Sequence, residues 1–348
     1  MEDRLRSIIV PVDEEGFCKS FTTDQMDYVD TDNDDNIELN PFAFFRRFGF
    51  LVVSNVLTTD DCDKTISEIF DIIESKTPFK RNDTSTWDNF PNDGSSIPQY
   101  GSPSKPPIFS KQFLLNRTNP NVFKVFSKLL KNEDLLTNHD RCCFFRPTLM
   151  NKSFSTRDNV HLDMNPFNWM GDGEKQRQEL DALTYARVGE FIVENNQPSK
   201  ADGLQLQAVL NLENNHVEDG GYVAVPGFHH EFVEYFRAKK PEYESPSLNF
   251  DKKEMVFKLA KRIAMRKGSM VIWNQQIPHG SFGNKSYKPR FAQFIKMFPT
   301  FTVSKKRAQH RSKTLNAILN DNFNGEFPFT KLSVQLLGLN DYNIKTID

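Results

Sequence analysis

The chain has 348 residues, of which 38% are hydrophobic and 26% charged, the composition of an ordinary soluble globular protein. Its 44 Lys and Arg residues nearly balance its 46 Asp and Glu residues, and the net charge of -2 gives no reason to expect a nucleic-acid partner. No apolar run approaches the roughly 20 residues that a membrane span requires, so we expect no membrane span.

The first third of the chain predicts a polar start followed by helices. Residues 1–40 are polar and acidic, and we interpret them as an N-terminal extension. Residues 42–75 predict a helix, a short strand and a second helix. The strand is expected from Phe48 to Val53, and Thr58 to Asp61 offer capping residues for the second helix. Residues 76–110 are rich in Pro, Ser, Asn and Asp and predict a long loop.

A further helix is expected near Pro120 to Lys131, where apolar side chains recur on one helical face. From about residue 141 the pattern becomes that of strands. The segment DGLQLQAVLNLEN places four leucines and one alanine on one face, with Gln207 and Val209 on the other. GGYVAVPGFHH, SMVIWNQQIPHG and RFAQFIKMF indicate further short strands.

These short strands predict a mainly β domain with flanking helices, arranged as an antiparallel jelly roll. We place this domain at residues 41–305, with insertions near 164–200 and 231–262. Residues 306–348 are interpreted as a C-terminal extension packed on the domain.

Cysteine use indicates a reducing compartment. The four cysteines, Cys18, Cys62, Cys142 and Cys143, do not form the CxxC spacing of a zinc site or redox loop. The N-terminal apolar stretch is short and is broken by Pro11, which is not typical of a signal peptide. We therefore expect a cytoplasmic protein.

The tripeptide HLD at residues 161–163 is the first part of a candidate metal site. In an extended segment, residues two apart point to the same side, so His161 and Asp163 can share one cation. One more His would complete a face of two His and one carboxylate, which leaves open positions on iron for a chelating cosubstrate and O2. Alone, however, an HxD pattern occurs by chance in many proteins.

The segment IPHGSFGNKSYKPR supplies the second His and a cationic side chain. His279 ends an apolar strand, and Arg290 follows eleven residues later at the start of the next. An iron-bound 2-oxoacid needs a cation for its distal carboxylate, and the planar fork of Arg binds a carboxylate with two hydrogen bonds. The hydroxyl of Ser281 can add a third.

With these motifs the chain resembles the phytanoyl-CoA dioxygenase family of iron and 2-oxoglutarate enzymes. The resemblance runs from about residue 42 to residue 300. It includes FRRFGFLVVSNVL, HLD, LQAVLNLENNHVEDGGYVAVPGFHH and GSMVIWNQQIPHGSFGN followed by Arg290. The distal pattern of His, Ser two residues later and Arg eleven residues later is matched by His279, Ser281 and Arg290.

The resemblance implies a double-stranded β-helix (a jelly roll, cupin-like) that binds Fe(II) through His161, Asp163 and His279. It also implies that Arg290 and Ser281 bind 2-oxoglutarate, with O2 as the second cosubstrate and ascorbate in a supporting role. The expected reaction hydroxylates a C–H bond of a small organic or lipid-like substrate and releases succinate and CO2.

One position departs from the family pattern. The family often has a Trp two residues after the Gln of the middle strand, beside the cosubstrate, and this chain has Val209 there. Gln207 lies on the same face and is a further candidate for binding the cosubstrate. The alternative is that Gln207 is an ordinary polar group of the strand.

Substrate contacts are expected from the insertion that begins beside Asp163. Asn165 and Trp169 combine a polar and an aromatic group near the metal, in a loop that GDG at 171–173 would allow to close. The alternative is a surface helix with aromatic packing contacts.

Residues 237–267 carry ten Lys or Arg against four Asp or Glu, which allows a CoA thioester or another phosphorylated substrate as an alternative to a free small molecule.

Two other classes of function remain open on the same residues. A metal-dependent hydrolase or isomerase could use the three ligands around Zn2+ or Mn2+, which would leave Arg290 without a cosubstrate. A non-catalytic binding protein could retain the fold alone, although the complete ligand set argues against it.

Overall fold

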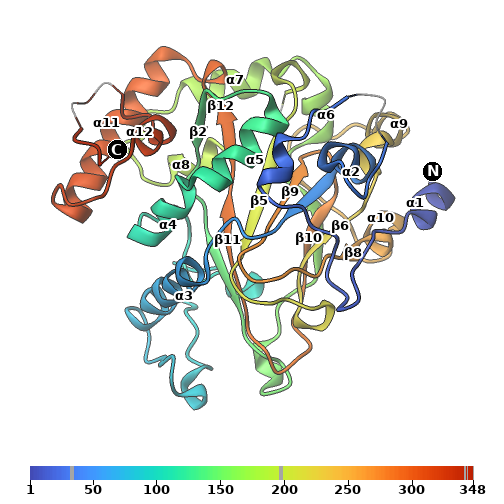
Figure 1. Cartoon of the computed structure of the whole chain (residues 1–348), viewed down its shortest axis with the longest axis horizontal. Coiled ribbons are helices and arrows are strands. Elements are labelled where there is room, and N and C mark those ends of the chain that lie inside the picture. Colours follow the sequence, from blue (N-terminus) through green and yellow to red (C-terminus); the bar gives the residue numbers. More distant parts are fainter. Residues whose placement is uncertain (32–34, 196–198, 341, 343, 348) are drawn as a thin grey trace.

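The computed structural model describes residues 1–31, 35–195, 199–340, 342 and 344–347. Its strands are β1 (Phe50–Val53), β2 (Leu135–Thr137), β3 (Cys142–Phe145), β4 (Asn159–Leu162), β5 (Leu206–Asn211), β6 (Gly221–Ala224), β7 (Leu248–Asn249), β8 (Lys261–Arg262), β9 (Met270–Asn274), β10 (His279–Phe282), β11 (Arg290–Ile295) and β12 (Met297–Pro299). Ten of them form two antiparallel sheets, with strand orders β1-β9-β5-β11-β3 and β7-β4-β10-β6-β8 (Figure 1). This pair of sheets confirms the predicted double-stranded β-helix.

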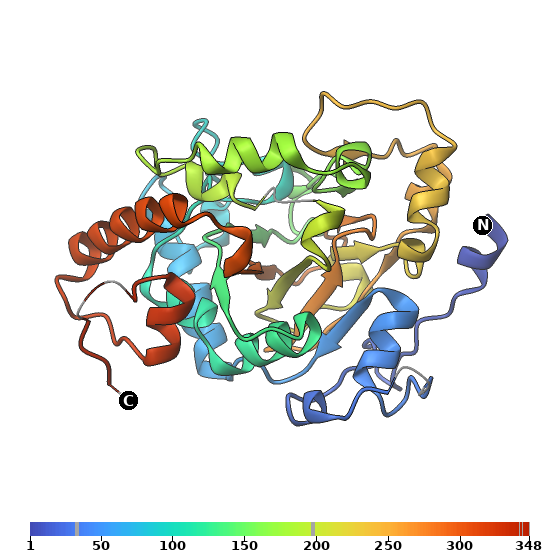
Figure 2. The same ribbon diagram turned by 90° about the horizontal axis from the view of Figure 1, so that it is seen from above.

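Helices surround the two sheets (Figure 2). They are α1 (Glu2–Ser7), α2 (Pro41–Phe48), α3 (Thr59–Glu74), α4 (Lys111–Arg117), α5 (Pro120–Leu130), α6 (Pro166–Met170), α7 (Glu174–Asp181), α8 (Glu190–Val193), α9 (Phe232–Arg237), α10 (Met255–Leu259), α11 (Lys305–Phe323) and α12 (Lys331–Leu337). Within the described part of the chain, no helix has both the length and the apolarity needed to cross a membrane.

The predicted helix, strand and helix of residues 42–75 are confirmed as α2, β1 and α3. The side chain of Asn40 caps α2, and Thr58 forms a capping box with Asp61 at the start of α3. Helix α2 ends at Gly49, whose φ is 73°. A Cβ atom there would lie 2.2 Å from Cδ1 of Ile277, so only glycine permits the sharp entry into β1.

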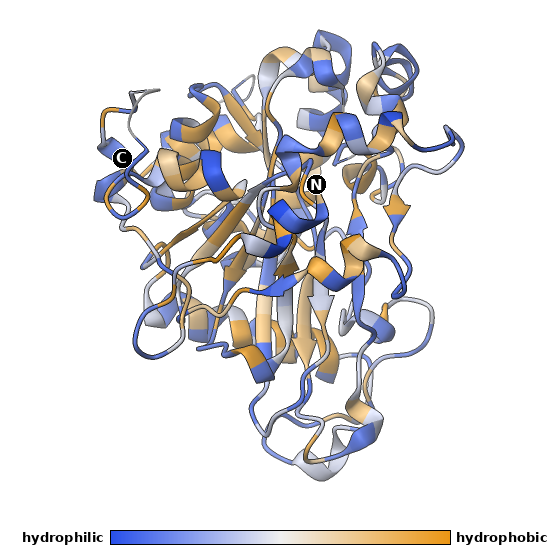
Figure 3. Ribbon diagram, turned by 90° about the vertical axis from the view of Figure 1, so that its right-hand side faces the viewer, coloured by the Kyte–Doolittle hydropathy of each residue, from blue (hydrophilic) through white to orange (hydrophobic). Residues whose placement is uncertain are grey.

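Phenylalanine fills much of the core. The strands inside the molecule are largely hydrophobic, whereas the surrounding helices and loops mix hydrophilic and hydrophobic residues (Figure 3). Phe144 of β3 stacks on Phe291 of β11 with ring centroids 4.6 Å apart, and Phe70 of α3 meets both rings edge-on. Aromatic pairs of this kind contribute beyond the area that they bury, so they fix α3 against the first sheet.

The two predicted insertions take different forms. Residues 164–200, of which 196–198 lie outside the described residues, form the short helices α6, α7 and α8. Residues 231–262 contain α9 and α10, but they also supply the edge strands β7 and β8. These strands pair with β4 and β6, so the second segment completes the sheet that carries HLD.

The polar N-terminal residues 1–40 nevertheless contact the core through scattered apolar side chains. Leu5, Phe17 and Phe21 are buried, and the backbone at Phe21 bridges to Val53 of β1. Residues 32–34 lie outside the described part of this segment.

A buried cluster of charges connects the C-terminal helix α11 to α8. Glu194, at the end of α8, accepts hydrogen bonds from Arg311 Nε at 3.1 Å and from the hydroxyl of Tyr185 at 2.8 Å. Arg307 lies 3.7 Å from the same carboxylate, and the side chains of Glu194, Arg307 and Arg311 are at most 1% exposed. Buried charges are tolerated only when they are paired, so Glu194 holds two arginines of α11 in place.

We expect Glu194→Gln to lower the free energy of unfolding by roughly 3–5 kcal/mol, because two buried guanidinium groups lose their anionic partner. Urea denaturation followed by circular dichroism measures this change. Glu179→Gln, on the exposed side of α7, is the matched control and should change stability by no more than about 0.5 kcal/mol. Equal unfolding midpoints for the two variants would contradict the role of the cluster.

Candidate functional site

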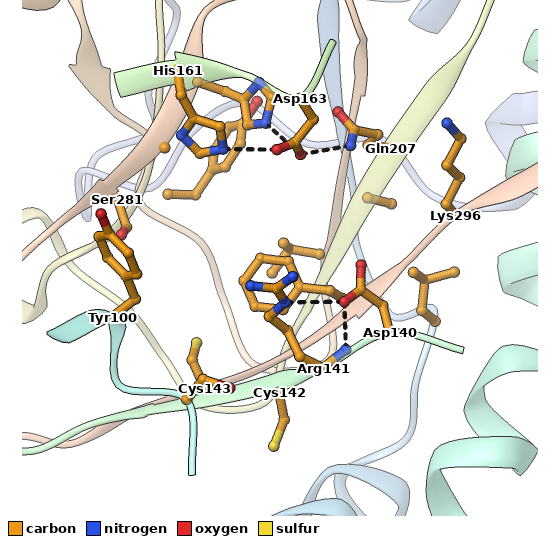
Figure 4. A pocket seen from close by; sticks show the side chains of 18 of the residues that line it. Tyr100, Asp140, Arg141, Cys142, Cys143, His161, Asp163, Gln207, Ser281 and Lys296 are labelled. Carbon is orange, nitrogen blue, oxygen red and sulfur yellow. Dashed lines mark hydrogen bonds and ion pairs between the residues drawn. The ribbon is translucent and has the colours of Figure 1, made fainter. Parts of the chain in front are cut away.

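A cavity of about 340 Å³ opens between the two sheets (Figure 4). Strands β3, β5, β9 and β11 of the first sheet and β4, β6, β7 and β10 of the second contribute to its wall. Polar and charged side chains from segments that are far apart in sequence therefore meet in one enclosed space, which is the usual form of a small-molecule site.

The three predicted metal ligands meet at one side of this cavity. Antiparallel pairing of β4 with β10 places His161 directly opposite His279. Asp163 follows the end of β4, and its carboxylate oxygens lie 3.1 Å from His161 Nε2 and 3.4 Å from His279 Nε2. One ligand atom from each residue lies within 4.8 Å of the other two. This is a facial triad of two histidines and one carboxylate.

The protonation states suit a divalent cation. Burial would raise the pKa of Asp163, but attraction to His161 and hydrogen bonds with both histidines hold it well below its usual range. Burial lowers the pKa of His279, so its imidazole is neutral at neutral pH. A charged carboxylate beside a neutral imidazole is the state in which these groups bind metal.

Two neighbours orient these ligands. His279 Nδ1 lies 2.9 Å from the carbonyl oxygen of Ile277, which can only accept a hydrogen bond, so Nδ1 carries the proton and Nε2 faces the cavity. Gln207 Nε2 donates to Asp163 Oδ2 at 2.8 Å. Gln207, predicted as a cosubstrate residue, thus lies in the cavity wall with its amide nitrogen bonded to a metal ligand.

Asn159, two residues before His161 on the same face of β4, was not predicted as a site residue. Its Oδ1 accepts hydrogen bonds from the backbone nitrogen of Ser281 at 2.8 Å and from the Ser281 hydroxyl at 3.1 Å. Its Nδ2 lies 3.3 Å from His161 Nδ1. One side chain therefore links a metal ligand to Ser281, and the alternation that grouped His161 with Asp163 would have indicated it.

Arg290 lies at the start of β11 and is only 2% exposed. Its Nη1 donates to the sulfur of Cys143 at 3.0 Å, and its guanidinium lies 4.9 Å from the ring centroid of Phe145. A Cβ atom on Gly221 would lie 2.4 Å from Arg290 Nε, so glycine at that position makes room for the side chain. Among the described residues no carboxylate lies within 4.0 Å of Arg290, and a buried guanidinium without an anion is costly.

Four buried polar atoms of the cavity wall have no hydrogen-bond partner within the described ranges. They are Gln207 Oε1, Tyr222 Oη, Trp273 Nε1 and Arg290 Nε. Buried polar groups are normally satisfied, so these atoms indicate a polar ligand in the cavity. A carboxylate beside Arg290 would give its guanidinium an anionic acceptor, and the residues present fit a small dicarboxylate together with a metal on the triad.

Val209 lies in the cavity wall, as its position in the strand predicted. A tryptophan side chain reaches this cavity from a different strand. It is Trp273 of β9, which lies opposite Gln207 of β5. Trp273 packs against His279 with ring centroids 4.8 Å apart and against Tyr222 at 4.7 Å. The sequence did not identify Trp273, which lies six residues before His279 in an apolar run.

The structure does not bring Asn165 and Trp169 to the cavity wall. The Asn165 side chain caps α6 and donates to the carbonyl oxygens of Glu242 and Ser245 at 2.9 and 2.7 Å. Trp169 is 8% exposed and packs against Phe232 of α9 at 5.1 Å between ring centroids. In this arrangement both residues pack α6 against the second insertion. This agrees with the alternative interpretation of the segment as a helix with aromatic packing contacts.

The cavity also carries three charged residues that the sequence did not indicate. Asp140 and Arg141 lie across from the triad, and Lys296 lies to one side of it, beyond Gln207 (Figure 4). Lys296 is 3% exposed, and burial lowers its pKa to about 8. Its ammonium donates to the carbonyl oxygen of Asn195 at 2.8 Å. No spacing motif marks these residues, which flank strands β3 and β11.

Comparison with known proteins agrees with this geometry. The family model of phytanoyl-CoA dioxygenase (PhyH) matches residues 45–292. A protein of Dictyostelium discoideum named "Putative phytanoyl-CoA dioxygenase" is 62% identical over 98% of this chain and 100% of its own.

Solved structures of lower identity share the fold. GlcNAc Inducible Gene 2 of Candida albicans superposes with a TM-score of 0.57 at 16% identity, covering 94% of this chain and 81% of that one. A hypothetical protein of Escherichia coli gives a TM-score of 0.56 at 11% identity, covering 92% and 85%. At such identities these two likenesses concern the fold alone.

We expect His279→Ala to weaken Fe(II) binding by more than about 100-fold. Loss of a residue that only supports a metal ligand typically weakens metal binding by about 10–100-fold, and loss of the ligand itself should weaken it further. Anaerobic isothermal titration calorimetry measures this affinity. His230→Ala is the control, since His230 is exposed and outside the cavity. If His279→Ala bound Fe(II) as tightly as His230→Ala does, the ligand assignment would be wrong.

Proposed function

This chain belongs to the phytanoyl-CoA dioxygenase family and is a 2-oxoglutarate-dependent dioxygenase, and we propose that it hydroxylates a C–H bond of a small organic or lipid-like molecule. The observation that carries the proposal is that one cavity combines the facial triad with a buried arginine that has no carboxylate within 4.0 Å among the described residues. The triad suits Fe(II), and the arginine suits the distal carboxylate of 2-oxoglutarate.

In this proposal His161, Asp163 and His279 would hold Fe(II), and ligands from the cavity would complete its coordination. The carbonyl oxygen of Ile277 fixes the tautomer of His279, and Gln207 holds the Asp163 carboxylate through its hydrogen bond. These contacts keep the ligand atoms in position before the metal arrives, which reduces the cost of ordering them.

Arg290 and Ser281 are assigned to the distal carboxylate of 2-oxoglutarate. The Arg290 guanidinium supplies charge and a rigid fork of donors, and Ser281 supplies a hydroxyl held by Asn159. Tyr222 and Trp273 offer two further donors that are free within the described residues. When bound together, Fe(II) and 2-oxoglutarate activate O2, release succinate and CO2, and supply the oxidant for a substrate C–H bond.

The rest of the wall keeps water away from this reaction. Phe145, Val209, Phe294 and Ile295 add apolar surface to the cavity. A water-poor site strengthens the attraction between Arg290 and a carboxylate, because the local dielectric is lower.

A CoA thioester is not part of the proposal. None of the ten basic residues of 237–267 lines the cavity. Several are also occupied elsewhere: Lys252 and Arg266 pair with acidic residues, and Arg262 donates to backbone carbonyl oxygens. These positions therefore give the proposal no support for a phosphate site on this stretch.

Succinate formation tests the proposed function. The enzyme is assayed with Fe(II), ascorbate and 2-oxoglutarate against a panel of small acids, amines and lipids, and we expect substrate-stimulated succinate with a product heavier by one oxygen atom. Omitting ascorbate tests its supporting role. Product formed with Zn2+ or Mn2+ and no 2-oxoglutarate would instead indicate a hydrolase or isomerase. Absence of turnover with every metal would indicate a binding protein.

We expect Arg290→Ala to raise the KM for 2-oxoglutarate by a factor of about 30 or more, since a buried carboxylate that loses its charged partner costs roughly 2–5 kcal/mol. Ser281→Ala should have a milder effect, because a neutral hydrogen bond is weaker. Lys288→Ala, an exposed residue just before β11, is the control. An unchanged KM in Arg290→Ala would remove Arg290 from the cosubstrate site.

A further inference from the structure

The cavity contains a second arginine that the proposed chemistry does not use. We propose that Arg141 binds a carboxylate group of the substrate, so that the enzyme acts on a small organic acid. This inference rests on the proposed function, because it takes Fe(II) to lie on the triad and 2-oxoglutarate to be bound by Arg290. It adds the class of substrate and the residue that recognises it.

Arg141 and Arg290 lie at opposite ends of the cavity wall. Arg290 pairs with Phe145 across strands β11 and β3, whereas Arg141 precedes β3 and its carbonyl oxygen accepts from the backbone nitrogen of Phe294. Phe145 lies four residue steps along the extended chain from Arg141, which corresponds to roughly 13 Å at the rise of a β-strand. Arg141 is therefore well removed from the end at which Arg290 would bind the distal carboxylate of 2-oxoglutarate.

The Arg141 side chain is oriented by one carboxylate, and the residues that the structure describes leave the outer edge of its guanidinium without a partner. Its Nε donates to Asp140 Oδ1 at 3.1 Å, and Asn195 lies 3.4 Å from the other oxygen of that carboxylate. Within the described residues, neither Nη nitrogen of Arg141 has a hydrogen-bond partner. Figure 4 shows the guanidinium facing His161 and Asp163 across the cavity. Two parallel donors on one planar edge are the arrangement that binds a carboxylate in a bidentate manner.

The charges of the cavity favour one further anion. Among the residues that the structure describes, three cations, Arg141, Arg290 and Lys296, line it together with two carboxylates, Asp140 and Asp163. A divalent iron and a 2-oxoglutarate dianion cancel each other, so the loaded site keeps an excess of one positive charge. A substrate with one carboxylate would neutralise this excess, whereas an ammonium substrate would increase it.

Lys296 does not replace Arg141 in this role. Its ammonium is directed at neutral oxygens, those of the Asn195 carbonyl at 2.8 Å and of the Gln275 and Gln205 side chains at 3.4 and 3.5 Å. These contacts occupy its donors, so Lys296 adds positive charge to the site while Arg141 offers free hydrogen-bond donors. Arg141 therefore carries the specificity for the carboxylate.

The test compares carboxylic acids with their neutral amides: butanoate with butanamide, hexanoate with hexanamide, and 3-phenylpropanoate with 3-phenylpropanamide. Dissociation constants are measured by anaerobic calorimetry on the enzyme with Fe(II) and 2-oxoglutarate, and again without them. At least one acid should bind the unmodified enzyme about tenfold or more tightly than its amide, a difference of about 1.4 kcal/mol. Arg141→Gln should abolish this preference by weakening acid binding alone, and Arg141→Lys should retain part of it.

The control is Arg146→Gln, five residues further along the chain. Its guanidinium lies between the rings of Phe90 and Phe154, outside the cavity, and its loss should leave the acid preference unchanged. The affinity for 2-oxoglutarate should stay within about twofold in Arg141→Gln. The proposal is wrong if no acid is preferred, or if the preference survives in Arg141→Gln. A loss of 2-oxoglutarate affinity in Arg141→Gln would mean that the guanidinium binds the cosubstrate. That result would also overturn the proposal.

These outcomes separate this inference from the proposed function. If the unmodified enzyme binds neither Fe(II) nor 2-oxoglutarate, the proposed function fails. The acid and amide affinities measured without Fe(II) and 2-oxoglutarate still show whether Arg141 binds a carboxylate.

Discussion

The register between β4 and β10 is the constraint on which the functional site depends. It places His161 opposite His279, and a slip of one residue would turn every side chain of the strand to the other face. Pairing of β10 with β6 on its other side, where His279 lies opposite Ala224, resists such a slip. Gly280 allows the close approach, since a Cβ atom there would lie 2.1 Å from the carbonyl oxygen of Asn159.

The ends of the cavity are stabilised by different parts of the chain. The Arg290 end lies within the sheets, where Gly221 and Cys143 accommodate the guanidinium. The opposite end depends on the end of α8, where Asn195 follows Glu194. The carboxylate of Glu194 is in turn bound by the buried arginines of α11. Helix α11 begins at residue 305, beyond the residues 45–292 that match the family model. A segment outside the family core therefore supports the end of the cavity where the substrate is expected.

Local sequence patterns predicted several elements of the fold. Alternation in β5, the capping residues of α3 and the helical face of α5 each depend on neighbours a few residues away, and all three elements are confirmed. Pattern alone did not reveal that residues 231–262 supply the edge strands β7 and β8, because strands of two residues are too short to show a period. Their structure depends on pairing with β4 and β6.

The sequence by itself identified the candidate residues of the site: HLD predicted two ligands on one face of a strand, and the spacing of His279 and Arg290 predicted the third ligand and a partner for a carboxylate. Only the tertiary structure decided what surrounds them. It brought Trp273 and Arg141 into the cavity and gave Asn165 a packing role next to the motif. The physical reason is that a motif records spacing along one chain segment, whereas these contacts depend on how separate strands and helices pair and pack in space.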